Sequence, residues 1–167
     1  KFPAAGYEPD TSVITRFIGS LKSQLHADAC RKLREGNRVY PCTLRYIWVR
    51  EQHASSHWHY HVAIILNNDR FNSWGRFRSS EEYRGEAANA SPNMAERMRK
   101  AWASALGVSP VDSFGLVHFA DSTFSINAGA DDYTDRFNEL FYWLSYFAKV
   151  HTKHYGNRHR NFGCSQN

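Results

Sequence analysis

The segment HWHYHVAIIL, residues 57–66, alternates histidine with other residues and then becomes continuously apolar. In an extended strand successive side chains point to opposite faces, so His57, His59 and His61 share one face. The apolar run that follows makes both faces hydrophobic, which is typical of a central strand covered on two sides. We therefore predict a buried strand whose first half carries imidazoles at the edge of the core, where a ligand can reach them.

The rest of the chain mixes helical and strand patterns. We expect a helix over 11–34, strands over 42–51 and 57–66, a loop over 70–92, a helix from Pro92 to Leu106, strands over 115–120 and 123–127, and a helix over about 131–150. The turn at 53–56 joins the first two strands into an antiparallel hairpin. This order predicts an α+β fold with an antiparallel central sheet of about 4–5 strands and flanking helices. Residues 1–10 are expected to form an N-terminal arm, and 11–167 a single domain.

Composition limits the class of protein. The chain of 167 residues is 42% hydrophobic, which excludes a disordered tail, and its apolar runs are too short to span a membrane. Its three cysteines are widely spaced and odd in number, which favours reduced thiols in a cytoplasm over a disulfide framework.

Positive charge gathers at the C-terminal end. The formal net charge is +5 and the pI about 9.2, and no acidic residue follows Glu139. The basic residues beyond it are Lys149, Lys153, Arg158 and Arg160. A basic tail beside aromatic residues favours a polyanionic partner, most simply nucleic acid, although a solvated charged face is the alternative.

Glu51 ends the strand that precedes the histidines. If the hairpin folds back at 54–56, its carboxylate comes close to His59, and with His61 the three side chains can hold a divalent ion while leaving positions open for water or phosphate oxygens. An open site of this kind suits Lewis-acid catalysis on a phosphate. The alternatives are histidines that only pack, or a structural zinc site that also uses His57.

The last predicted helix carries two tyrosines away from its apolar side. At about 100° per residue, Tyr142, Tyr146, Lys149 and Lys153 fall on one narrow stripe. The residues expected to face the core lie on the other side: Phe137, Leu140, Phe141, Leu144 and Ala148. A nearby ammonium or metal ion lowers the pKa of a phenol, and tyrosine is among the side chains that form covalent intermediates. The alternative is an aromatic pair that packs on a neighbouring element.

These motifs resemble those of a known superfamily. Glu51, the His59-Tyr60-His61 motif running into VAIIL, and Tyr146-Phe147-Ala148-Lys149 are similar to the motif set of the HUH endonucleases, which include rolling-circle replication initiators, relaxases and transposases. The segments YIWVREQ, HYHVAIILN and LFYWLSYFAKVHTKHYG resemble more narrowly the inovirus gene-two-protein family, over about residues 40–165.

The resemblance implies a HUH fold, ferredoxin-like or RRM-like, with the histidine pair on a central strand. It implies Mg²⁺ or Mn²⁺ held by His59, His61 and Glu51, Tyr146 as the nucleophile, Lys149 assisting it, and Tyr142 as a second tyrosine. The chain departs from the family pattern in two ways. The family's first strand motif is missing, because the segment before residue 40 reads as helix, and His57 opens the alternative of a His57/His59 pair.

The implied activity is site-specific nicking and strand transfer of single-stranded DNA through a covalent 5′-phosphotyrosine, which would initiate rolling-circle replication of a phage, prophage or plasmid. Contacts with single-stranded or hairpin DNA are expected from Lys153, Arg158, Arg160 and Trp74. Host helicase or replication proteins are the other expected partners, in the cytoplasm of a bacterial host. The competing hypotheses are a non-cleaving nucleic-acid binding or regulatory module on the same fold, and a metal-bound structural domain of a larger protein.

Overall fold

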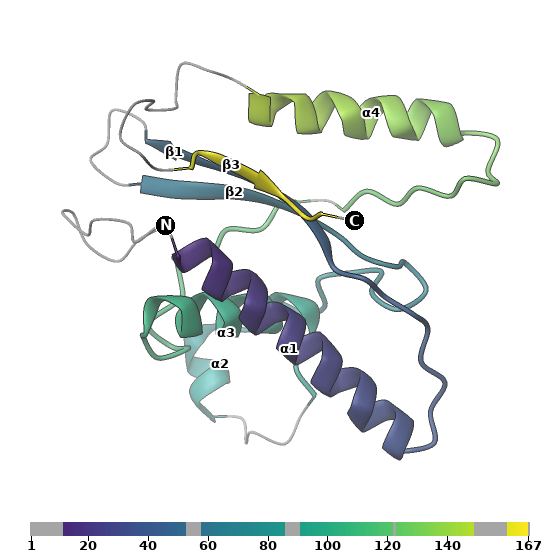
Figure 1. The fold of residues 1–167 in the computed structure, drawn as a ribbon. Coiled ribbons are helices and arrows are strands. Elements are labelled where there is room, and N and C mark those ends of the chain that lie inside the picture. Colours follow the sequence, from purple (N-terminus) through teal and green to yellow (C-terminus); the bar gives the residue numbers. More distant parts are fainter. Residues whose placement is uncertain (1–11, 53–57, 86–90, 122, 149–159, 167) are drawn as a thin grey trace. The chain divides into compact units, whose positions relative to one another are not determined.

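The computed structural model describes residues 12–52, 58–85, 91–121, 123–148 and 160–166 (Figure 1). The chain divides into two compact units, and each is described by itself. The helical unit contains 9–42 and 69–119, and the sheet unit contains 1–8, 43–68 and 120–167. The predicted N-terminal arm lies outside the described residues.

Two helices build the core of the helical unit. Helices α1 (Val13–Arg34) and α3 (Met94–Leu106) pack against each other, and the ring of Phe17 meets that of Trp102 edge-on at 5.8 Å between centroids. The buried apolar residues of α1 follow the predicted helical spacing: Val13, Ile14, Phe17, Ile18, Leu21 and Leu25. Both predicted helices are confirmed. The apolar residues of α1 recur at the period of a helix, so they form one buried stripe along it.

Local capping explains where the helices of this unit begin and end. Asn93 caps α3 in a reciprocal capping box with Glu96, and Gly107 ends the helix in the left-handed conformation at φ 71°. A short helix α2 (Ser80–Gly85) interrupts the predicted loop over 70–92, so that prediction is wrong there. Its start is a second capping box, in which the Ser79 hydroxyl accepts from the Glu82 N–H and the Glu82 carboxylate accepts from the Ser79 N–H.

The sheet unit holds three antiparallel strands among the described residues. They are β1 (Arg45–Gln52), β2 (Trp58–Ile65) and β3 (Phe162–Cys164), in the order β2-β1-β3. The predicted hairpin is confirmed, with Glu51 paired to His59 and Trp48 to Val62. In this sheet β1 is the central strand and the histidine strand β2 lies at an edge, so the expectation of a central histidine strand is corrected.

The α+β class is confirmed, but a sheet of 4–5 strands is not. The segments 115–120 and 123–127 were predicted as strands, yet neither is a strand where the structure describes it. A turn occupies 110–116, and Gly115 within it has φ 81°, a left-handed conformation that breaks an extended run. The third strand is instead the three-residue β3, which pattern analysis did not predict.

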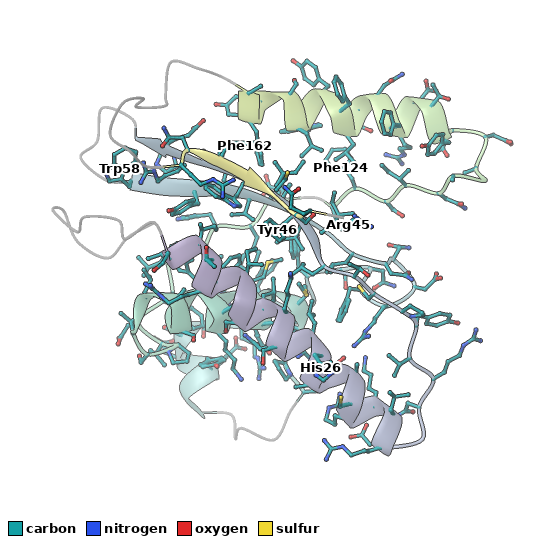
Figure 2. The ribbon with its side chains drawn as sticks, in the orientation of Figure 1. His26, Arg45, Tyr46, Trp58, Phe124 and Phe162 are labelled. Carbon is teal, nitrogen blue, oxygen red and sulfur yellow. The ribbon has the colours of Figure 1, made fainter. Side chains whose placement is uncertain are left out.

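The last helix is shorter and more exposed than expected. Helix α4 (Tyr133–Ser145) is followed by a 3₁₀ turn, η1 (Tyr146–Ala148), and runs beside the sheet (Figure 1). None of its residues is buried, and the predicted core residues Phe137 and Phe141 are largely exposed. Their assignment to the core was wrong, whereas Leu140 and Leu144 from the same predicted side are half-buried. The ring of Trp143 lies 6.1 Å from that of Phe124, which is drawn below the helix in Figure 2.

Among the described helices, none is both long and apolar enough to cross a membrane.

Candidate functional site

The register of the hairpin brings one carboxylate and two imidazoles to the same face of the sheet. Glu51 on β1 pairs directly with His59 on β2. Two residues further along β2, His61 pairs with Val49 of β1. Directly opposed residues of an antiparallel pair project to the same side, and a step of two residues along a strand keeps that side. Glu51, His59 and His61 therefore face the same side, as the sequence predicted.

The side chains of these residues converge. His61 Nε2 lies 3.2 Å from Glu51 Oε2, and the rings of His59 and His61 meet edge-on with centroids 5.1 Å apart. One ligand atom from each of the three residues lies within 4.8 Å of the others. Three nitrogen and oxygen donors at this separation can bind one divalent ion, whose ligand bonds are about 2.0–2.2 Å long.

Burial differs between the two sides of this cluster. The Glu51 side chain is only 2% exposed, whereas that of His61 is 38% exposed. The Nε2 atom of His61 is nevertheless buried and makes no hydrogen bond within the described residues, although it faces the Glu51 carboxylate. An imidazole nitrogen that makes no hydrogen bond and lies beside a carboxylate can coordinate a cation together with that carboxylate. The donor set therefore fits a metal ion approached from the solvent side.

The turn after α4 supplies aromatic residues to the cluster. The ring of Tyr146 lies 6.5 Å from that of His61, and the ring of Phe147 lies 6.1 Å from it. Tyr146 is 47% exposed, so its face is available to a substrate. Tyr146 and Phe147 both belong to the 3₁₀ turn η1 that directly follows α4. Phe147 was not predicted as a site residue, and a single aromatic residue beside a tyrosine gives no signal for it.

Tyr142 occupies a different position. It lies one turn before Tyr146, is 78% exposed, and makes no ring contact with the histidines in the part of the chain that the structure describes. The structure therefore brings Tyr146 to the cluster and leaves Tyr142 in solvent. The two tyrosines of the predicted stripe therefore differ in their surroundings.

The other predicted residues divide into three groups. Lys149, Lys153 and Arg158, together with the alternative ligand His57, lie outside the described residues. Arg160 is described and exposed, next to the strand β3. Trp74 belongs to the helical unit, where it is half-buried and its ring packs at 5.3 Å from that of Phe119.

Sequence reasoning missed a polar contact on the opposite face of β1. Arg50 is fully buried and donates from Nε and Nη2 to the Asn161 side-chain oxygen at 3.2 and 2.9 Å. Its guanidinium lies 4.4 Å from the ring of Trp58, which stands at the start of β2 in Figure 2. Burial lowers the pKa of Arg50, and the neighbouring Tyr60 opposes this shift. This contact joins β1 to Asn161, one residue along the strand from the candidate ligand Glu51.

Comparisons with known proteins identify the family. The family model described as "YagK/YfjJ C-terminal domain" matches residues 1–165, so the chain belongs to that family. Among its relatives, "Uncharacterized protein YagK" of Escherichia coli (strain K12) is 34% identical over 94% of this chain and 71% of the relative. "Uncharacterized protein YfjJ" of the same organism is 31% identical over 94% of this chain and 72% of the relative. No solved structure matches the chain.

Proposed function

We propose that this protein is a metal-dependent nuclease that nicks single-stranded DNA at a specific site and retains the 5′-phosphate on Tyr146. The observation that carries the proposal is the approach of the Tyr146 ring to His61, at 6.5 Å between centroids, beside the donor cluster of Glu51 and His59. The resemblance of these same residues to the HUH motifs points to the same reaction. The names of the relatives state no activity, so the proposal rests on the site.

Glu51, His59 and His61 would hold Mg²⁺ or Mn²⁺. When bound, such an ion polarises a phosphate oxygen and stabilises negative charge that develops in the transition state. The buried Glu51 carboxylate supplies the negative charge of the ligand set, and the two imidazoles supply neutral nitrogen donors. The partial exposure of His61 leaves the solvent side open to a phosphodiester.

The residues of the chain define the proposed covalent step. The Tyr146 oxygen forms a bond to phosphorus, and the bond between phosphorus and the 3′-oxygen breaks. The phenol loses its proton and the departing 3′-oxygen gains one, so the products are a 5′-phosphotyrosine and a free 3′-hydroxyl. Attack by the 3′-hydroxyl of another strand reverses this step and accounts for strand transfer. Lys149 would assist by stabilising the negative charge that develops on the phenol oxygen, and Tyr142 would serve a second round.

The proposal also covers the residues that contact DNA and the biological role. Lys153, Arg158 and Arg160 would contact DNA phosphates, and Trp74 would stack on a base. The biological role would be initiation of rolling-circle replication of a phage, prophage or plasmid, in the cytoplasm of a bacterial host and with host replication proteins such as a helicase. A nucleic-acid binding module that does not cleave is the alternative.

A covalent adduct tests the proposal directly. The protein is incubated with Mn²⁺ and random-sequence single-stranded oligonucleotides labelled at the 3′ end, and the products are separated in SDS. We expect a labelled adduct that is lost with EDTA and in Tyr146→Phe but retained in Tyr133→Phe, a matched control at the other end of α4. An adduct that survives Tyr146→Phe would reject this nucleophile, and binding of the pool without any adduct would favour the non-cleaving alternative.

A further inference from the structure

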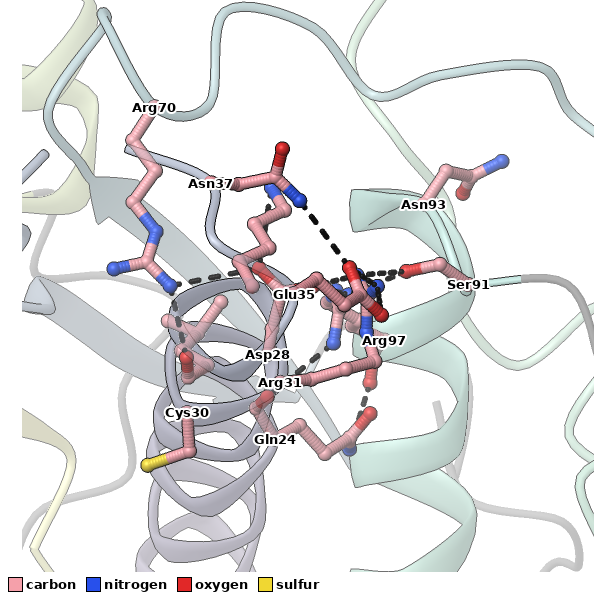
Figure 3. Close-up of polar contacts among 12 residues, drawn as sticks. Gln24, Asp28, Cys30, Arg31, Glu35, Asn37, Arg70, Ser91, Asn93 and Arg97 are labelled. Atoms are coloured by element: carbon pink, nitrogen blue, oxygen red, sulfur yellow. Dashed lines mark hydrogen bonds and ion pairs between the residues drawn. The ribbon is translucent and has the colours of Figure 1, made fainter. Parts of the chain in front are cut away.

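One buried carboxylate in the helical unit is surrounded by cations (Figure 3). The side chain of Asp28, on α1, is 1% exposed. Its oxygens lie 2.8 Å from Arg97, 3.0 Å from Arg31, 3.4 Å from Lys32 and 3.5 Å from Arg70. The next acid on the helix, Glu35, also pairs with Arg31, at 2.8 Å. Among these contacts, four positive groups therefore share two carboxylates.

Two of these four positive groups, Arg70 and Arg97, lie in the protein interior. The side chains of Arg70 and Arg97 are 8% and 7% exposed, and the buried Nε of Arg70 has no hydrogen-bond partner among the described residues. Burial lowers the pKa of Arg97; the carboxylate of Asp28 opposes this shift, while the charges of Arg31 and Arg70 add to it. Like charges brought together with too few anions are unfavourable unless another anion approaches them.

The same cluster opens to solvent at the C-terminal end of α1. The side chains of Arg31 and Lys32 are 37% and 36% exposed. Arg34 and Arg38 follow and are exposed; the Arg34 side chain donates to the Cys30 carbonyl, and the guanidinium of Arg38 lies 4.5 Å from the ring of Tyr40. Neither makes an ion pair within the described part of the chain. Arg31 and Lys32 thus share Asp28 with the two buried guanidinium groups, and the exposed Arg34 and Arg38 follow them in the chain.

The charge of the whole unit agrees with this local excess. Residues 9–42 and 69–119 contain 13 basic and 9 acidic side chains, a formal charge of +4 out of the +5 of the chain. The basic C-terminal tail of the sheet unit, which the sequence singled out, is therefore not the main source of the net charge.

We infer that Arg31, Lys32, Arg34 and Arg38 form a surface, here called the α1 basic surface, that binds the phosphodiester backbone of nucleic acid. Guanidinium groups match phosphate oxygens in a bidentate geometry, and several separate cations suit several phosphates better than a single compact anion. Buried Arg70 and Arg97 would strengthen the positive potential of this surface. The α1 basic surface lies on the helical unit. The inference goes beyond the proposed cleavage, because contacts with phosphates do not depend on base sequence.

Salt-dependent binding of DNA by the full chain tests this inference. Fluorescence anisotropy is measured with labelled single-stranded and duplex oligonucleotides of two unrelated sequences over a range of KCl concentrations. We expect Arg31→Gln/Lys32→Gln to weaken binding of both sequences equally and to reduce the slope of log K against log [salt] by about 0.7 per lost contact for single strands and about 0.9 for duplex. The form of DNA that responds identifies the natural ligand.

Two further variants separate an effect of the surface from an effect on folding or on overall charge. Arg34→Gln/Arg38→Gln touches neither Asp28 nor Glu35, so it reports on the surface even if the first variant fails to fold by circular dichroism. Lys22→Gln removes one positive charge elsewhere on α1, about 180° from Arg31 at about 100° per residue, and serves as the control when losses are compared per charge removed. Unchanged affinity and slope in both double variants, or an equal loss in Lys22→Gln, would overturn the inference. Binding is measured with EDTA present, which prevents the proposed cleavage, so failure of cleavage and failure of this surface are distinguishable.

Discussion

Glu51 and His61 lie on neighbouring antiparallel strands, and their Oε2 and Nε2 atoms are 3.2 Å apart. The backbone partner of Glu51 is His59, so the contact with His61 is a diagonal one between residues on the same face. Because the pairing register determines the face of every side chain, a slip of one residue would turn both histidines away from the carboxylate. The metal centre we propose is thus a property of the hairpin register.

The first prediction concerns metal binding. Glu51→Gln keeps the size of the side chain but removes its charge, and we expect it to weaken Mn²⁺ binding by at least about tenfold, since even loss of an outer-shell partner costs about 10–100-fold. Isothermal titration calorimetry with Mn²⁺ measures the effect. Glu139→Gln, an exposed acid on α4, is the control and should bind as the parent does. Equal affinity in Glu51→Gln would remove this carboxylate from the site.

The second prediction separates the two tyrosines. Tyr142→Phe should form the first covalent adduct at close to the parental rate, because its 78% exposed ring makes no ring contact with His61 in the described structure. Single-turnover formation of the adduct with Mn²⁺ checks this. If Tyr142→Phe abolishes the adduct while Tyr146→Phe retains it, the nucleophile has been misassigned.

The hairpin and its site could be predicted because alternation and spacing are local. The distance in sequence from Glu51 to His59 predicts which residues oppose each other, and the structure has that register; the turn predicted over 53–56 lies outside the described residues. The position of Tyr146 beside His61 was expected only from a family resemblance. It depends on where α4 ends and η1 begins, which no periodicity in the sequence shows.

Other elements could not be predicted for identifiable reasons. The strand β3 has three residues, too few to show alternation, and it forms only because β1 offers a free edge far away in sequence. The central position of β1 follows from that pairing. By contrast, the capping box that starts α2 was visible as Ser79 followed three residues later by Glu82, and it was overlooked within a polar segment.

The third prediction tests how β3 packs. A Cβ on Gly163 would lie 2.6 Å from the Trp48 ring, so Gly163→Ala must displace either the indole or the strand. We expect it to reduce the free energy of unfolding by about 1–3 kcal/mol, as overpacking does, in urea unfolding followed by circular dichroism. Gly19→Ala in α1 meets nothing within 4 Å and should be neutral or stabilising by about 0.5–1 kcal/mol. Equal stability of the two variants would contradict the close approach of Trp48 to β3.

The last prediction concerns Asp28 and pH. Burial would raise the pKa of this carboxyl, but the hydrogen bond from Arg31 and the charges of Arg97 and Lys32 outweigh it and hold the pKa below its ordinary value of 3.8. A folded pKa below the unfolded one means that the unfolded chain binds more protons. The stability contributed by the carboxylate is therefore complete above about pH 3.8 and is lost as pH falls through the lower, folded value.

Asp28→Asn removes that contribution while keeping the shape of the side chain. We expect a loss of about 3 kcal/mol in the free energy of unfolding at pH 7, since the variant leaves buried Arg97 and Arg70 without their carboxylate. Urea unfolding at a series of pH values should show the gap between parent and variant narrowing below about pH 3.8, where the parental carboxylate takes up a proton. Glu35→Gln, which alters only exposed contacts with Arg31 and Asn37, should cost under about 1 kcal/mol. A gap that stays constant through this acid range would mean that the Asp28 charge does not hold the cluster together.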